Sequence, residues 1–214
     1  MTTLIIIAKE CVPGRVKTRL HPPLSLEQAA TLASASLADT FRAVETLDVS
    51  RRILLFDGNR LPLGSEPYDV VHQVSGDLDM RIGAIFDECE GPTVLVGMDT
   101  PQLDAATLAP LFDNWPSDVD AFLGFANDGG YWMIALAEPD GSLIRGVPMS
   151  QGDTGQLQLD RLTEAGLRVR MLPQLVDVDT IDDARFVAGF APHTEFARTL
   201  ASFDTSAAVN GADR

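Results

Sequence analysis

The chain has 214 residues, of which 45% are hydrophobic, so it can bury one core but is too short for several large domains. Its formal net charge of −15 disfavours nucleic acid and anionic membrane surfaces as partners, because both need broad lysine and arginine coverage. Two cysteines without C-x-x-C spacing, and no apolar run of about 18 residues, predict neither a disulfide framework nor a membrane span, and a cytoplasmic location is expected.

The first predicted element is a buried parallel strand over residues 4–8, because this run is short, β-branched and uninterrupted. A stiff irregular loop is predicted over residues 9–23, where prolines and a glycine prevent a helix. The stretch 8–20 holds four of the sixteen basic residues, including Lys9 and Lys17, the only lysines. Ser25, with Gln28 in capping-box position, predicts the start of a helix.

The middle of the chain alternates strands with helices. Strands are predicted at 52–56, 68–74 and 93–96, and helices over the segment that carries Leu78 and Phe86 and over 104–114. Such alternation is typical of a mostly parallel sheet with helices on both faces. The sequence therefore predicts an α/β fold.

The alternation of strands with helices becomes irregular in the last third of the chain. Strand-like runs at 120–126 and 131–137 flank residues 127–130, which predict either a hairpin-like reversal or a longer excursion. A helix over 153–165, a strand over 167–172 and a final helix ending near residue 189 follow. We expect one domain over 1–203 and a disordered tail over 204–214, which is small and polar.

The basic loop is the strongest functional signal. Ligands of open parallel sheets bind at the carboxyl ends of strands, where Gly14 allows close backbone approach and Lys17 and Arg19 supply charged donors. Lys9 and Arg15 add further positive charge. Neither the P-loop order nor the dinucleotide-binding G-x-G-x-x-G order is present. The alternative is that these cations only offset acidic neighbours on the surface.

Aspartates follow two other predicted elements. Asp99 comes directly after the strand 93–96, and Asp177 and Asp179 alternate so that both can face one side. Carboxylates beside bound phosphates are typical ligands of magnesium. The alternative is a turn or helix-cap role, and one of Asp177 and Asp179 is expected to cap the last helix, although the sequence does not say which.

Two further segments are candidates for recognition. Gln73, Gly76 and Arg81 form a candidate loop for a base or sugar. The second segment is either a simple reversal or a wall of a ligand site, and its residues are Asp128, Gly129, Gly130 and Tyr131. The three histidines are scattered, and none is predicted to be a general base.

Together, the stretches 8–20, 97–101, 128–132 and 177–180 resemble the four landmarks of the DUF2064 family, part of the glycosyltransferase-A-like superfamily. Some members are called radical-SAM/selenodomain-associated transferase 1, and molybdenum-cofactor and F420-pathway guanylyltransferases are more distantly similar. The likeness covers about residues 3–190. Residues 149–153 depart from the tryptophan-containing stretch expected there.

The resemblance implies a three-layer α/β/α nucleotide-diphospho-sugar-transferase fold. It also implies that Gly14, Lys17 and Arg19 hold the donor phosphates, and that Asp99 binds Mg²⁺ or Mn²⁺ with help from Asp177 or Asp179. Gln73 and Gly76 would bind the nucleobase, and the acceptor would be bound by Asp128, Gly129, Gly130 and Tyr131. We also expect Lys9 and Arg15 to take part in phosphate binding, and Lys17 and Asp99 to be the catalytic residues.

The activity expected from these features is that of a metal-dependent transferase with a nucleotide-activated donor and a small acceptor. Transfer of a nucleotidyl group is slightly favoured, because a cationic loop after the first strand suits a triphosphate. A glycosyltransferase that uses a nucleotide sugar is the close alternative. A non-catalytic nucleotide-binding module is the alternative from another class.

Overall fold

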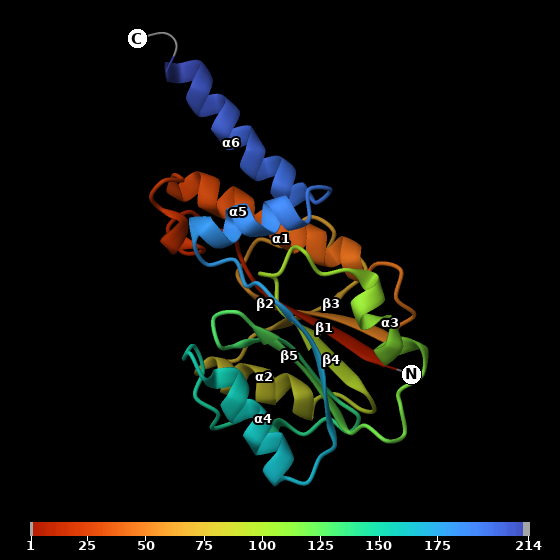
Figure 1. The fold of residues 1–214 in the computed structure, drawn as a ribbon. Helices are drawn as coiled ribbons and strands as arrows, with labels where there is room; N and C mark the ends of the chain where they lie inside the picture. The colour runs from red at the N-terminus through yellow and green to blue at the C-terminus, as the bar shows by residue number, and fades with distance from the viewer. Residues whose placement is uncertain (1, 212–214) are drawn as a thin grey trace.

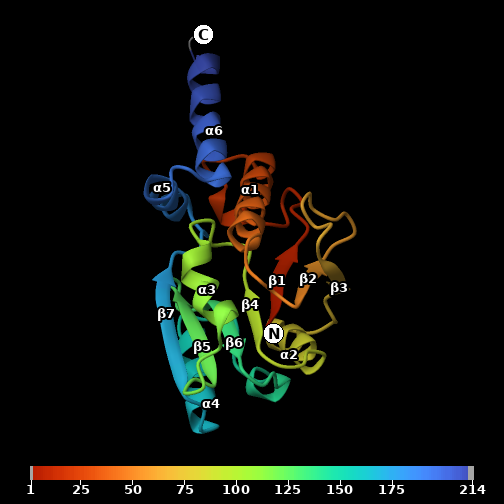
Figure 2. The same ribbon diagram turned by 90° about the vertical axis from the view of Figure 1, so that its right-hand side faces the viewer.

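The computed structural model describes residues 2–211, whose elements form a sheet with helices on both faces (Figure 1). The sheet has seven strands in the order β3-β2-β1-β4-β6-β5-β7, so β3 and β7 are its edges (Figure 2). All neighbouring pairs are parallel except those that β6 makes. The strands are β1 (Thr3–Lys9), β2 (Arg51–Asp57), β3 (Asp69–His72), β4 (Thr93–Val96), β5 (Ala121–Ala126), β6 (Tyr131–Leu136) and β7 (Val169–Leu175).

Helices cover both faces because alternate residues of the central strands are apolar on each side. Leu4 and Ile6 of β1 pack with one cluster, and Ile5 packs with another. The first cluster includes residues of α1 and α3, and the second includes residues of α2 and α4. These helices are α1 (Leu26–Val44), α2 (Leu78–Asp87), α3 (Ala105–Asp113) and α4 (Thr154–Glu164). The predicted three-layer α/β/α architecture is thus confirmed.

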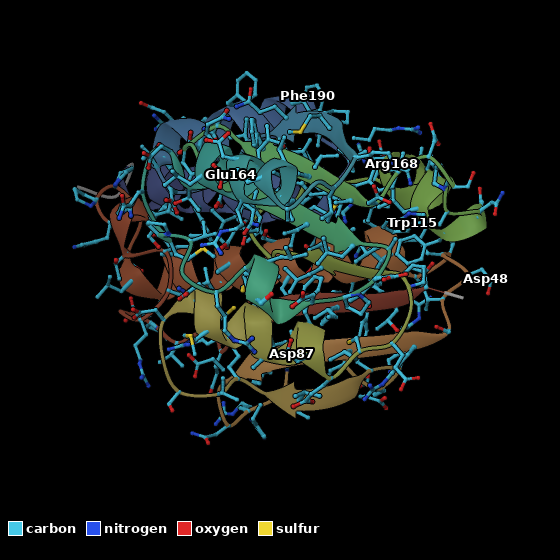
Figure 3. All side chains as sticks on the ribbon, turned by 90° about the horizontal axis from the view of Figure 1, so that it is seen from below. Asp48, Asp87, Trp115, Glu164, Arg168 and Phe190 are labelled. Atoms are coloured by element: carbon cyan, nitrogen blue, oxygen red, sulfur yellow. The ribbon has the colours of Figure 1, made fainter. Side chains whose placement is uncertain are left out.

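Side chains at the ends of two helices show the second helical layer. Figure 3, seen from below, labels Asp87 and Glu164, the last residues of α2 and α4. In Figure 1 both helices lie on the side of the sheet opposite to α1. Asp87 accepts a hydrogen bond from the Gly141 amide at 2.8 Å, which ties α2 to the short 3₁₀ helix Gly141–Leu143.

Local capping follows the sequence. The Ser25 side chain accepts from the Gln28 amide and the Gln28 side chain accepts from the Ser25 amide, so the predicted capping box begins α1. Asp104 caps α3 through the Thr107 amide. Strands β5 and β6 are antiparallel neighbours, so residues 127–130 form a hairpin-like reversal rather than a longer excursion. Among the residues described, no helix is long and apolar enough to span a membrane.

Two expectations differ from the structure near the end of the chain. Strand β7 runs to Leu175 rather than ending at Leu172, because an edge strand tolerates Pro173 in its interior. A helix after residue 189 was not predicted, yet α6 (Glu195–Gly211) follows α5 (Ile181–Phe190). Both pack on the outer side of α1, and α6 extends away from the sheet (Figure 1). The tail predicted to be disordered overlaps α6 over 204–211, and 212–214 lie outside the described residues.

Candidate active site

A cavity of about 340 Å³ lies at the carboxyl-terminal edge of the sheet. The parallel strands β1, β2, β3 and β4 all end at this edge, so the loops after them meet there. Predicted site residues from separate parts of the chain contribute to its lining; they are Lys9, Gln73, Asp99, Asp128, Gly130, Tyr131 and Asp177.

Lys17 stands at the point where three aspartates converge. Its Nζ atom lies 3.0 Å from Asp99 Oδ1, 3.3 Å from Asp177 Oδ1 and 3.1 Å from Asp179 Oδ1. The Lys17 side chain is only 8% exposed. Its backbone has φ 48° and ψ 40°, a left-handed conformation that residues other than glycine rarely adopt. The buried side chains of Val16 and Leu20 hold this segment on both sides.

The charges of this cluster shift two pKa values. Burial by itself would lower the pKa of Lys17, but the negative charges of Asp99, Asp177 and Asp179 outweigh it and raise the pKa above its usual value. Lys17 is therefore an ammonium at physiological pH. Burial also raises the pKa of Asp177 to about 7, opposed by Lys17 and reinforced by Asp99, Asp179 and Asp128.

Hydrogen bonds of their main-chain groups position two of the three aspartates, Asp99 and Asp177. The amide of Val178 donates to the carbonyl of Asp99 at 3.1 Å, and the amide of Asp177 donates to Asn127 Oδ1 at 2.8 Å. Helix α5 is capped by Thr180, whose side chain accepts from the Asp183 amide. The expectation that Asp177 or Asp179 caps this helix is therefore wrong: Thr180 offers the hydroxyl, and both aspartates face Lys17.

A metal ligand set is not formed by the side chains as they stand. Among the side chains that the structure describes, no group of three or more His, Cys, Asp or Glu residues is placed to hold a metal ion. The donor chemistry nevertheless fits a hard divalent cation, because three carboxylates converge on one ammonium. Asp99 Oδ1 is buried, and the Lys17 ammonium 3.0 Å away is its cationic partner.

The predicted phosphate residues divide into two groups. Lys9 and Arg15 line a second polar cavity of about 310 Å³, which shares Lys9, Asp57 and Gln73 with the first. Lys17 and Arg19 instead contact aspartates, and Arg19 Nη1 lies 2.9 Å from Asp179 Oδ2 with its own side chain 75% exposed. Gly14 has φ 76°, which suits the turn between these groups.

The candidate base-binding loop is held together by Arg81. Its guanidinium donates to the Gly76 carbonyl at 2.7 Å and to Gln73 Oε1 at 3.0 Å. Gln73 Nε2 in turn donates to the carbonyls of Ala8 and Leu55. The side-chain amide of Gln73 is thus hydrogen-bonded within the protein. Gln73 and Arg81 both line the first cavity. Gly76 forms the turn before α2 with φ 119°.

The candidate acceptor segment also contributes to the lining of the cavity. Asp128 Oδ1 accepts from the Gly130 amide at 2.9 Å, while Gly129, with φ 89°, packs its backbone against Gly152. The Tyr131 hydroxyl is 3.9 Å from Met149 Sδ. Burial, followed by the charge of Asp79, raises the pKa of Tyr131, which therefore remains a neutral phenol.

Several lining residues escaped the sequence reasoning. Asp57 ends β2 at the same edge as Asp99, and the strand-end rule used for Asp99 would have identified it. The stretch with Met149, Ser150 and Gln151 carries no such signal, because its place at the cavity depends on long-range packing. Leu78, Ile82 and Leu95 give the cavity an apolar part.

Many solved structures are similar to this chain, among them the following three. A protein of Desulfovibrio desulfuricans G20, provisionally identified as a nucleotide-diphospho-sugar transferase, has a TM-score of 0.84 at 22% identity, covering 95% of each chain. A provisionally identified glucose-1-phosphate thymidylyltransferase from Bacillus anthracis has a TM-score of 0.58 at 11% identity, covering 92% of this chain and 99% of its own. At such identities the likeness concerns the fold.

The third is the Mycobacterium tuberculosis glucosyl-3-phosphoglycerate synthase in complex with Mn²⁺, UDP and glucosyl-3-phosphoglycerate. Its TM-score is 0.50 at 12% identity, over 82% of this chain and 70% of its own. No curated protein matches the chain. The family model described as "Uncharacterized protein conserved in bacteria (DUF2064)" matches residues 40–151, more than half of the sequence. The chain therefore belongs to the DUF2064 family.

Proposed function

We propose that this protein is a metal-dependent transferase that binds a nucleotide-activated donor and passes a nucleotidyl or glycosyl group to a small acceptor. Residues 1–203 would act as one transferase domain. The observation that carries the proposal is the ion-pair cluster of Lys17 with Asp99, Asp177 and Asp179 beside the first cavity. Separate loops bring these charges together, as a site for a charged ligand requires.

Asp99, Asp177 and Asp179 would hold the Mg²⁺ or Mn²⁺ ion. When bound, such an ion neutralises charge on the phosphates of the donor. The mycobacterial synthase with the same fold was solved with Mn²⁺ and UDP, which supports this assignment. The protein's own contribution is to orient the reacting groups and to stabilise charge, so no side chain is needed as a nucleophile.

Lys9 and Arg15 would bind the donor phosphates. Both line the second cavity, whereas Lys17 is engaged by the aspartates. Gln73 and Gly76 would lie near the nucleobase, with Arg81 supplying a fixed donor toward it. Because an arginine only donates hydrogen bonds, it suits a base edge that carries a carbonyl oxygen.

Asp128, Gly129, Gly130 and Tyr131 would border the acceptor, and three of them, Asp128, Gly130 and Tyr131, line the same cavity. The carboxylate of Asp128 could accept a hydrogen bond from an acceptor hydroxyl. The apolar side chains of Leu78 and Ile82 lie elsewhere in the lining and could contact a ring.

Nucleotidyl transfer is favoured over glycosyl transfer, because the cationic loop after β1 suits a triphosphate. The fold neighbours include both a thymidylyltransferase and a glucosyl-3-phosphoglycerate synthase, so they support a nucleotide donor without favouring either reaction. The two reactions release different products: nucleotidyl transfer from a nucleoside triphosphate gives pyrophosphate, and glycosyl transfer from a nucleotide sugar gives a nucleoside diphosphate. A non-catalytic nucleotide-binding module would release neither.

The decisive experiment is a thermal-shift panel of nucleoside triphosphates and nucleotide sugars with Mg²⁺ or Mn²⁺, followed by product analysis with the ligand that stabilises most. We expect metal-dependent stabilisation and turnover, both lost in Asp99→Asn and kept in the exposed control Asp113→Asn. Binding that survives in Asp99→Asn, with no turnover by the wild type, would favour the non-catalytic module. No stabilisation by any ligand would refute both.

A further inference from the structure

The Lys17 ammonium lies where a cation bound by the three aspartates would have to lie. We propose that Lys17 and a divalent cation compete for the same carboxylate oxygens, so that Lys17 is a built-in counter-ion that metal binding displaces. The inference rests on the proposed function for the metal's role. The inference adds that the metal affinity of the site is regulated by Lys17.

The geometry allows one cation at a time. Nζ lies between 3.0 and 3.3 Å from one oxygen of each aspartate. A magnesium ion bound to such oxygens would stand about 2.0–2.1 Å from them. It would therefore lie well within 4 Å of the ammonium, where two positive charges in a buried setting repel strongly. The same three oxygens cannot serve both cations.

The charge balance favours the exchange. Three carboxylates surround a single ammonium, and Arg19 compensates only Asp179, through its other oxygen. Asp99 Oδ1 is buried and pairs with Lys17 Nζ, which it shares with Asp177 and Asp179. A divalent ion brings two charges instead of one and is a better match for these oxygens. Lysine therefore holds the cluster together without satisfying it fully.

Lys17 can leave the cluster without unfolding the loop. The side chains of Val16 and Leu20 are each 1% exposed and anchor the backbone on both sides. Asp99 and Asp177 also line the first cavity, which gives a displaced ammonium space to move into. Only the lysine side chain needs to turn.

Calorimetric titration of the full chain with Mn²⁺, without nucleotide, tests the competition directly. We expect Lys17→Met to bind Mn²⁺ at least tenfold more tightly than the wild type, because the competitor is gone. Arg19→Met is the matched control: it removes a cation that contacts Asp179 from an exposed position, and its affinity should change less than threefold. Circular dichroism checks that each variant is folded.

The wild-type chain offers a second measurement that does not depend on a variant. Lys9 and Lys17 are its only lysines, so ¹³C-labelled lysine gives two assignable Cε signals. Saturation with Mg²⁺ should move the Lys17 signal toward the position of a free lysine and leave Lys9 nearly unchanged.

The outcomes separate this inference from the proposed function. Equal or weaker Mn²⁺ binding by folded Lys17→Met, or a Lys17 signal that stays fixed while Mg²⁺ binds, would overturn the competition and leave the transferase proposal intact. Absence of metal binding in every variant, even with nucleotide present, would overturn both.

Discussion

Lys17 Nζ lies 3.0 Å from Asp99 Oδ1, so the loop after β1 and the turn after β4 meet in one ion pair. The two strands are parallel neighbours, and their carboxyl ends therefore lie at the same edge of the sheet. The contact explains how a positive loop is held in an acidic chain: it is bound to the turn by the charge of Asp99.

The raised pKa of Asp177 makes stability depend on pH. Its folded-state pKa is about 7, against a usual value of 3.8, so between these values the folded state binds more protons than the unfolded state. The contribution of Asp177 is therefore most favourable below pH 4 and is lost as the pH rises toward 7. Asp177→Asn has no titrating carboxyl at this position, so the variant does not lose this stability as the pH rises. In a metal chelator, we expect the variant to gain on the order of 1 kcal/mol over the wild type at pH 8.

Urea unfolding at pH values from 4 to 8 measures this difference. The free energies of unfolding of the two proteins should approach each other near pH 4 and separate as the pH rises. Asp113→Asn, which changes an exposed aspartate, should give a difference that varies little with pH. A constant difference between Asp177→Asn and the wild type would contradict the assignment.

Much of this arrangement could be predicted from sequence. The apolar run of β1 and the basic residues after it indicate a strand followed by an anion site, and Asp99 follows β4 by the same rule. The partner of Lys17 could not be predicted, because charge alone allows either a phosphate or a carboxylate. Three-dimensional packing decides that question by burying its ammonium among the aspartates.

Arg81 and Gln73 should have separable effects. The Arg81 side chain is 32% exposed and lines the cavity, so Arg81→Met should weaken nucleotide binding about tenfold and lower the Tm less than Gln73→Leu does. Gln73 donates to two backbone carbonyls and accepts from Arg81, so Gln73→Leu should lower both the nucleotide affinity and the Tm. Calorimetry and thermal unfolding measure the two effects. Equal losses of Tm in both variants would argue that Arg81 is only structural.

Gly129 is the position where the site tolerates least change. A Cβ there would lie 1.9 Å from the Gly152 carbonyl oxygen, and its φ of 89° is unfavourable for other residues. We expect Gly129→Ala to lose roughly 2–4 kcal/mol of folding stability in urea unfolding. Gly152→Ala is the matched control on the other side of the contact. A Cβ there meets nothing within 4 Å, so a loss as large as that of Gly129→Ala would contradict the explanation.

Helix α6 shows what a local pattern misses. Thr194 accepts from the Ala197 amide, and Phe196 and Leu200 are buried at helical spacing, so a signal was present in the sequence. The partner that fixes the helix start is distant. Asp39, in α1, accepts from the amides of Glu195 and Phe196, and no local rule relates these positions.

Asp39 should therefore control the docking of α6. Its carboxylate is buried, and one oxygen accepts from the Glu195 amide at 2.9 Å while the other accepts from the Phe196 amide at 2.8 Å. Asparagine has one acceptor oxygen, so Asp39→Asn leaves one amide unpaired and should cost about 1–3 kcal/mol. Hydrogen exchange should rise in the first turns of α6 and remain unchanged in α4.

Glu195→Gln provides the comparison for that prediction. It weakens the ion pair of Glu195 with Arg42, whose side chains are 46% and 53% exposed, and leaves both amide contacts to Asp39 in place. A surface pair contributes at most about 1 kcal/mol, so exchange in α6 should stay near the wild-type rate. Faster exchange in Glu195→Gln than in Asp39→Asn would show that the surface charge, and not the buried carboxylate, holds the helix.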